Sequence, residues 1–306
     1  AYKTSEKLGA NEMNQKYEHY YVPDQSPWPI VGAVALFFIA VGAALTVMDM
    51  GKEGGSGIYI LYAGIAVLLY MLFSWFKNVI EESHQGLYSA QMDRSFRQGM
   101  SWFIFSEVMF FAAFFGALFY VRTYSLPWLG GEGAGLVTNT FLWPGYENVW
   151  PLTANGPGEV GGQFKTMGAW GLPALNTAIL LTSGVTLTWA HHALKEMKRI
   201  QLIAGLSLTV ALGIIFMYFQ AMEYGHAFND LNLNMGSGIY GSTFFMLTGF
   251  HGFHVTIGTI MLMVILGRSI YGHFNPNNHF AFEAVAWYWH FVDVVWLGLF
   301  IFVYWI

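Results

Sequence analysis

The 306-residue chain is 55% hydrophobic and 18% aromatic, and only 10% of its residues are charged. A soluble domain carries about 25% charged residues, so the composition excludes a disordered chain and argues against a soluble enzyme. The net charge of −5 argues against a nucleic-acid partner, and the absence of cysteine excludes disulfides, thiolate-bound metals and a cysteine nucleophile. The class that remains is an integral membrane protein.

Long apolar runs predict the membrane spans, because a spanning helix needs about 20 mostly apolar residues. We expect seven spans, in chain order Ile30–Met48, Ile58–Phe76, Gln98–Val121, Met167–Ala190, Gln201–Met222, Gly236–Gly267 and Ala284–Ile306. The runs do not alternate between apolar and polar residues, which favours helices over barrel strands. Within them the only formal charges are Glu107 and Asp293.

Two polar segments lie outside these runs. Residues 1–29 are polar and acidic, which is not the pattern of a cleavable signal peptide. Residues 125–166 are rich in Gly and Pro, and we expect them to form a loop on the outer face. Within this loop Gly156–Gly161 formally matches a dinucleotide-binding fingerprint. No strand precedes it and Pro157 removes a backbone donor, so it predicts no nucleotide site.

The distribution of basic residues predicts the orientation. Most of the 13 Lys and Arg residues fall on alternate connections that share a side with the N-terminus. The excess of Lys and Arg marks the inner face of a membrane. We therefore expect the N-terminus on the cytoplasmic or matrix side and the C-terminus outside.

The buried carboxyl group of Glu107 is the clearest candidate for function. It lies ten residues into the third predicted span, near the membrane midplane and among mostly apolar neighbours. An ionisable group at this depth is costly to bury, and it usually has a function or a polar partner. It could be a proton-relay carboxyl, or a neutral carboxylic acid that makes a hydrogen bond across helices.

Further polar groups fall on the last two predicted spans. His251 and His254 lie three residues apart on one helical face, where a packing role is favoured over metal or haem binding. Glu283, His290 and Asp293 share one side of the seventh span and form either a packing network or a proton path. We expect no metal or haem in this chain.

Several stretches resemble subunit III of cytochrome c oxidase. The most extended is Ala281–Leu297, which reads AFEAVAWYWHFVDVVWL. The others lie at the N-terminal entry and in the third, fourth and sixth spans: Ser26–Pro29, Ser106–Phe111, Leu175–His192 and Tyr240–His254.

The resemblance implies an all-α membrane fold with a two-helix bundle at 30–80 and a five-helix bundle at 81–306. It also implies a lipid-filled cleft between the bundles. In this family the subunit packs against subunit I, near subunit II, and binds phospholipids. Haem and copper belong to the partner subunits of the oxidase, which reduces oxygen to water and pumps protons in the respiratory chain.

The resemblance also implies roles for individual residues. Glu107 matches a carbodiimide-reactive glutamate of the family. Trp75, Glu82 and Arg268 match residues that contact lipid, and a guanidinium such as that of Arg268 can bind a phosphate through two donors.

We therefore interpret the chain as a non-redox accessory subunit of a cytochrome c oxidase in a bacterial inner membrane, supporting proton uptake. A stand-alone proton-coupled transporter would need more ionisable groups along one path than this chain offers. A seven-helix receptor would place its N-terminus outside, against the distribution of basic residues.

Overall fold

The computed structural model describes residues 21–22, 25–50, 55–151 and 163–306. Most of the polar segment 1–29 and the run Gly156–Gly161 lie outside the described residues. Apart from a single β-bridge between Asn275 and Asn278, the regular structure of the described residues is helical. The chain divides into two compact units, which end and begin at Phe96 and Arg97.

The first unit is built on a pair of packed helices, α2 (Trp28–Met48) and α3 (Gly57–His84). Their backbones approach closely at glycines. A Cβ atom added to Gly64 would lie 2.7 Å from the backbone nitrogen of Ile39, and one added to Gly42 would overlap the backbone of Leu61. Small residues of this kind let membrane helices pack at short range.

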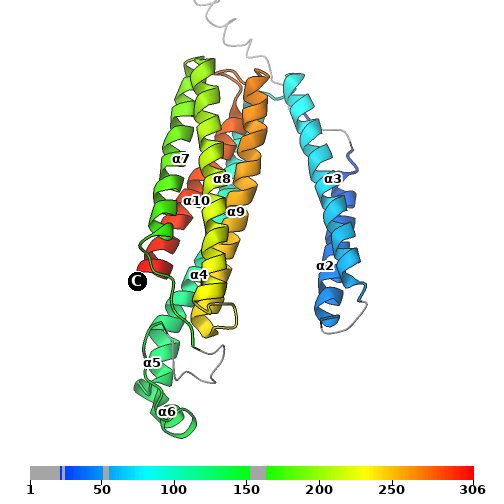
Figure 1. The fold of residues 1–306 in the computed structure, drawn as a ribbon. Helices are drawn as coiled ribbons and strands as arrows, with labels where there is room; N and C mark the ends of the chain where they lie inside the picture. Colours follow the sequence, from blue (N-terminus) through cyan, green and yellow to red (C-terminus); the bar gives the residue numbers. More distant parts are fainter. Residues whose placement is uncertain (1–20, 23–24, 51–54, 152–162) are drawn as a thin grey trace, which may run out of the picture. The chain divides into compact units, whose positions relative to one another are not determined.

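The second unit contains five long helices. They are α4 (Ala90–Tyr120, which begins in the first unit), α7 (Leu172–Lys195), α8 (Arg199–Asp230), α9 (Gly238–Ile270) and α10 (Phe280–Leu299). Helix α7 packs against α8, α8 against α9, α9 against α10, and α10 against α7, which closes a ring of four helices (Figure 1). The buried core of the unit lies mainly within this ring.

Trp289 of α10 occupies the centre of the ring. Its side chain is fully buried, and its indole N–H donates to Ser183 Oγ of α7 at 2.8 Å. Added Cβ atoms at Gly213 of α8 and Gly258 of α9 would each lie 2.9 Å from the indole ring. One side chain therefore contacts all three neighbouring helices, and the two glycines leave the room that it needs.

Helix α4 packs onto this ring through aromatic side chains. Phe110 lies edge-on to Phe250 of α9, with ring centroids 5.0 Å apart, and Phe111 lies 6.0 Å from Phe291 of α10. Aromatic pairs in such tilted or edge-to-face arrangements add to the free energy gained from burial. These contacts fix the face that α4 turns toward α9 and α10.

The segment 125–166, expected to be a loop, is partly helical. A π-helical turn, η1 (Val121–Ser125), carries α4 into a short helix α5 (Leu126–Leu129). A 3-10 turn, η2 (Gly133–Gly135), then precedes α6 (Leu136–Leu142). Pro127 does not break α5 because it occupies the first turn, where a backbone N–H has no helical partner.

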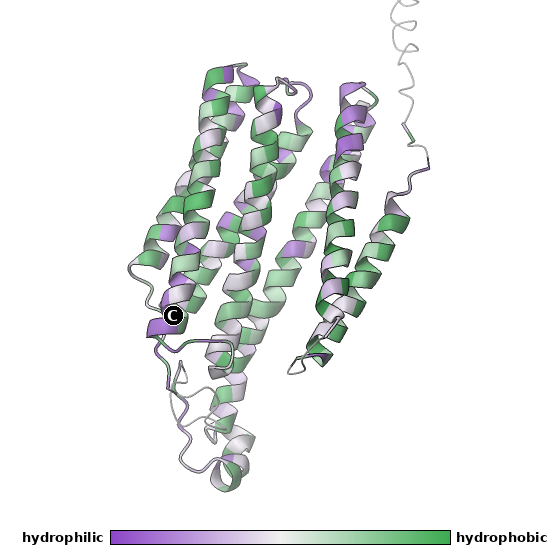
Figure 2. Ribbon diagram, turned by 45° about the vertical axis from the view of Figure 1, so that its right-hand side comes forward, coloured by the Kyte–Doolittle hydropathy of each residue, from purple (hydrophilic) through white to green (hydrophobic). Residues whose placement is uncertain are grey.

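Most helices extend past the apolar runs that predicted them. Helix α3 continues from Phe76 to His84, so the boundary expected at residue 80 falls inside it, and Lys77 and Glu81 form an ion pair of 3.8 Å on this extension. Charged residues end an apolar run without ending a helix, because charged side chains are tolerated at the membrane–water interface. Figure 2 shows hydrophilic residues gathered mostly toward helix ends and in the connecting segments.

One helix is displaced along the sequence, with its expected length of 24 residues unchanged. The fourth predicted span began at Met167, but α7 begins at Leu172. Gly171, with φ at 109°, precedes the helix, and Pro173 lies in its first turn. Glycine adopts this left-handed conformation without the strain that a Cβ would cause.

Six helices in the described part of the chain are long and apolar enough to cross a membrane. They are Trp28–Met48, Gly57–His84, Ala90–Leu129, Arg199–Asp230, Gly238–Ile270 and Phe280–Trp305, the last including the π-helical turn η3 (Phe300–Trp305). The protein is thus an α-helical, multi-pass membrane protein. Helix α7 is less apolar, and the buried polar residues Asn176 and Ser183 lower its hydropathy while facing the bundle.

The Ser183–Trp289 hydrogen bond predicts a stability effect. In Ser183→Ala the indole N–H loses its acceptor in the core, so we expect the free energy of unfolding to fall by about 1 kcal/mol. Thermal unfolding of the purified protein in detergent measures this change. Thr182→Ala is the control, because Thr182 is exposed and bonds only to the Ala178 carbonyl of its own helix. Equal melting temperatures for the two variants would contradict the prediction.

Candidate functional site

Glu107 of α4 has a partner across the bundle. His254 Nε2 of α9 lies 2.9 Å from Glu107 Oε2, and the two side chains are 10% and 22% exposed, respectively. The rings of Phe111 and Tyr288 lie beside the imidazole, at 5.0 and 6.3 Å. The carboxyl group therefore has one polar partner in a largely aromatic environment.

The hydrogen bonds of His254 determine how many protons it can share with Glu107. Its Nδ1 lies 2.6 Å from the carbonyl oxygen of Phe250, which can only accept, so Nδ1 carries a proton. One further proton then suffices for the contact between Nε2 and Oε2, whichever atom carries it. The pair can hold a single proton and move it between a carboxyl group and an imidazole.

A second buried carboxyl group lies toward the C-terminal end of α8. Glu223 is fully buried, and the Tyr304 hydroxyl donates to its Oε1 at 2.5 Å. Its Oε2 has no hydrogen-bond partner among the described residues. Sequence analysis did not select Glu223, because it lies one residue beyond the apolar run Gln201–Met222.

The third carboxyl group, Glu283, lies in the first turn of α10. Arg97 of α4 donates to its Oε2, while His279 Nε2 and His191 Nε2 lie 3.1 and 3.5 Å from its Oε1. Arg97 also lies over the ring of Phe280, with its guanidinium carbon 5.4 Å from the ring centroid. Arg97, His191 and His279 were not among the candidate residues, since they lie in three different parts of the sequence.

The expected polar stripe on α10 is divided in the structure. His290 Nδ1 lies 3.6 Å from Asp293 Oδ2, one helical turn away, while Glu283 makes the separate contacts described above. His290 Nε2 lies 3.4 Å from the Thr188 hydroxyl of α7. The stripe therefore consists of two local groups.

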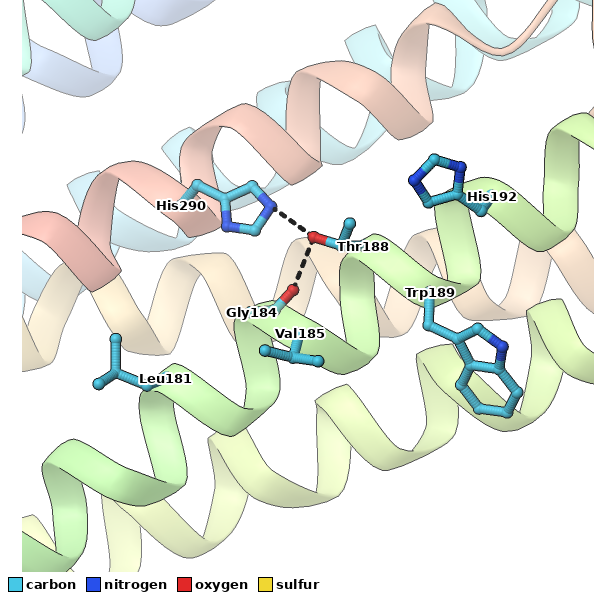
Figure 3. A pocket seen from close by; sticks show the side chains of 7 residues that line it. All are labelled: Leu181, Gly184, Val185, Thr188, Trp189, His192 and His290. Atoms are coloured by element: carbon cyan, nitrogen blue, oxygen red, sulfur yellow. Dashed lines mark hydrogen bonds between the residues drawn. The ribbon is translucent and has the colours of Figure 1, made fainter.

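His290 lines an open pocket of about 550 Å³ on the surface shared by α7 and α10. The other lining residues all belong to α7: Leu181, Gly184, Val185, Thr188, Trp189 and His192. Figure 3 shows His290 directed toward Thr188, whose hydroxyl also bonds to the Gly184 carbonyl. The side chain of His290 is 45% exposed, so a polar group lies exposed on an otherwise apolar surface.

The contacts of His251 are those of a residue that packs between helices. It is fully buried, and its Nε2 lies 3.1 Å from the carbonyl oxygen of Val292, to which it donates. Its ring lies 5.0 Å from that of Trp296. These contacts join α9 to α10.

The candidate lipid-binding residues lie near helix ends. Trp75 is 47% exposed on α3. Glu82 accepts a hydrogen bond of 2.7 Å from the hydroxyl of Tyr88. Burial and the neighbouring Glu82 carboxylate raise the pKa of Tyr88, so the tyrosine keeps its proton and remains the donor.

Arg268 occupies the last turn of α9. Its guanidinium carbon lies 4.6 Å from the ring centroid of Phe274, and its Nε has no hydrogen-bond partner among the described residues. The aromatic ring supports the cation without using its N–H donors. This unpartnered Nε is buried beneath the surface at the end of the helix.

Comparisons with known proteins identify the family. The family model described as "Cytochrome c oxidase subunit III" matches residues 18–134 and 152–306. Among similar proteins, "Cytochrome c oxidase subunit 3" of Squalus acanthias is 43% identical over 96% of this chain and 99% of its own length. The proteins of the same name from Tetraodon nigroviridis and Formosania lacustris are 40% and 41% identical over the same shares. The chain therefore belongs to the cytochrome c oxidase subunit III family.

Proposed function

We propose that this chain is the subunit of a membrane-embedded cytochrome c oxidase that holds lipid and partner surfaces in place and supports proton uptake. Membership of the family makes it a non-catalytic subunit of that terminal oxidase. The observation that carries the proposal is the match over nearly the whole chain, together with the apolar helices that run through both units. A stand-alone transporter is not supported by this family.

The membrane arrangement is part of the proposal. We include α7 as a seventh span, because its polar residues Asn176 and Ser183 are buried inside the protein and need not face lipid. The basic residues favour an N-terminus on the inner side and a C-terminus outside. A bacterial membrane and a lipid-filled cleft between two bundles stay predictions. The relatives named above are vertebrate proteins and do not bear on the first of these.

The surface of α7 and α10 around His290 is our candidate for contact with subunit I. A histidine that faces hydrocarbon is costly, and ionisable residues at this depth usually face protein or a water-filled cavity. Leu181, Val185 and Trp189 of α7 line the same pocket and give a partner helix an apolar surface around the histidine. A partner helix seated in the pocket would cover both features.

Purification from native membranes in mild detergent tests the proposal as a whole. We expect haem and copper in stoichiometric amounts on co-purifying chains, because the subunit belongs to an oxidase whose redox centres lie elsewhere. Absorbance spectra and metal analysis of the purified complex measure both. A chain that purifies alone and carries out transport in vesicles would overturn the proposal.

The Glu107–His254 pair is our candidate for the proton-related role. It lies within the bundle, one proton suffices for its contact, and both side chains retain some exposure. These features suit a group that takes up and passes on protons. The proposal places the pair beside the path of proton uptake, at a distance from the oxygen chemistry.

Glu107→Gln tests this role, because glutamine keeps the shape and a hydrogen bond to His254 but cannot carry the proton. We expect the enzyme to assemble and to consume oxygen, with a modest fall in protons pumped per electron. Oxygen electrode and proton-pulse measurements on reconstituted vesicles give both quantities. Glu223→Gln is the control for removal of a buried carboxyl group. Complete loss of oxygen consumption in the assembled Glu107→Gln enzyme would contradict the placement of the pair.

Arg268 is our candidate anchor for a phospholipid headgroup. A cation near the membrane surface contributes about 1 kcal/mol to the binding of anionic lipid, which is about a fivefold effect. In Arg268→Ala we expect a loss of that size in tightly bound anionic lipid, while Arg268→Lys retains the charge and loses the two-donor geometry. Mass spectrometry of lipids in the purified complex measures it, with the exposed Lys195→Ala as the control. Unchanged lipid content in Arg268→Ala would contradict the proposal.

A further inference from the structure

One cluster of ionisable side chains is not used by the function proposed above. It gathers Arg97 from α4, His191 from α7, His279 from the segment before α10, and Glu283 from the first turn of α10. His279 and Glu283 are buried, with side chains 9% and 12% exposed, and His191 is 23% exposed. The cluster is more open at the edge formed by His191 and Arg97, whose side chain is 35% exposed.

Two of the three distances between the potential ligand atoms are close to those around a small divalent ion. Glu283 Oε1 lies 3.1 Å from His279 Nε2 and 3.5 Å from His191 Nε2, and all three atoms lie within 4.8 Å of one another. Tetrahedral zinc with bonds of 2.0–2.2 Å places its ligand atoms about 3.4 Å apart. Two of the three spacings therefore already bracket the required value.

The hydrogen bonds of His279 leave the atom that faces the cluster as an acceptor. Its Nδ1 lies 3.2 Å from the carbonyl oxygen of Asn275, which can only accept, so Nδ1 carries the proton. In the neutral ring Nε2 then carries a lone pair, which is directed at the Glu283 carboxylate. Two acceptors at 3.1 Å repel each other unless a second proton or a metal ion bridges them. A backbone carbonyl that orients a histidine in this way is the common outer partner of a metal ligand.

His191 supplies the second lone pair. Its Nε2 is buried and has no hydrogen-bond partner among the described residues, although it lies 3.5 Å from Glu283 Oε1. An unpaired buried nitrogen is costly, and a bound ion would remove that cost. Packing of its ring against those of His279 and Phe282, at 5.6 and 5.3 Å, limits its rotation.

We propose that His191 Nε2, His279 Nε2 and Glu283 Oε1 form a binding site for a divalent transition-type ion such as Zn²⁺, with water as a fourth ligand. Two imidazoles and one carboxylate suit zinc, whereas calcium and magnesium prefer oxygen ligands. Arg97 holds Glu283 Oε2, which leaves Oε1 as a single oxygen ligand. The site departs from our sequence-based expectation of no metal, because its ligands meet only in the folded bundle.

The charge balance predicts moderate affinity. One carboxylate faces the ion, and Arg97 already neutralises much of its charge. The site is therefore better suited to an ion that exchanges with the surrounding solution than to a permanently bound structural ion.

Zinc binding to the intact oxidase complex tests the site. The complex is treated with a chelator and dialysed to equilibrium against a series of Zn²⁺ concentrations, and zinc in excess of the dialysate is measured by mass spectrometry relative to haem iron. We expect one zinc per complex to be lost in His279→Ala and in His191→Ala, or its affinity to fall at least about tenfold. His226→Ala is the matched control, because it removes an exposed histidine–carboxylate pair elsewhere.

Anomalous diffraction at the zinc edge on the unmodified complex locates the ion without any variant. We expect a peak within bonding distance of His191, His279 and Glu283. A peak elsewhere, no peak at saturating zinc, or equal zinc binding by His279→Ala and His226→Ala would overturn the proposal. In that case a proton on one imidazole neutralises the cluster instead.

Discussion

The five-helix unit depends on the placement of one large side chain. Trp289 lies where α7, α8, α9 and α10 meet, and it must bury a wide ring and also satisfy one N–H donor. Gly213 and Gly258 provide the space, and Ser183 provides the acceptor. Trp296 makes a similar bond to Thr177, 2.9 Å long, further along the same two helices. These two bonds fix how α7 and α10 are rotated and shifted relative to each other.

That rotation decides which polar groups meet. A helix turned so that Trp289 and Trp296 face α7 presents Asp293 to Gly184, whose missing side chain leaves room for the carboxylate. The same rotation brings Val292 into contact with His251. In the interior of a membrane protein, polar side chains find partners across helices because neither lipid nor water is available to them.

The ionisable groups form separate pairs and clusters. Glu107 bonds to His254, Glu223 to Tyr304, and Glu283 to Arg97 with two histidines beside it, each group joining a different set of helices. A transporter that moved protons through this chain would need such groups in a connected series. The arrangement instead gives each carboxyl group a local environment, which suits a subunit that supports chemistry carried out by its partners.

The sequence alone determined the membrane class and most of the helices, and it singled out Glu107 as a candidate residue. Apolar runs predict spans because the hydrocarbon core has a fixed thickness of about 30 Å, and Glu107 is conspicuous because no other formal charge shares its run. Only the tertiary structure decided the partners. His254 lies 147 residues from Glu107, and Arg97 lies 186 residues from Glu283. Such contacts depend on how each helix is rotated in the bundle, and that rotation is set by the joint packing of glycines, tryptophans and hydroxyl groups on several helices.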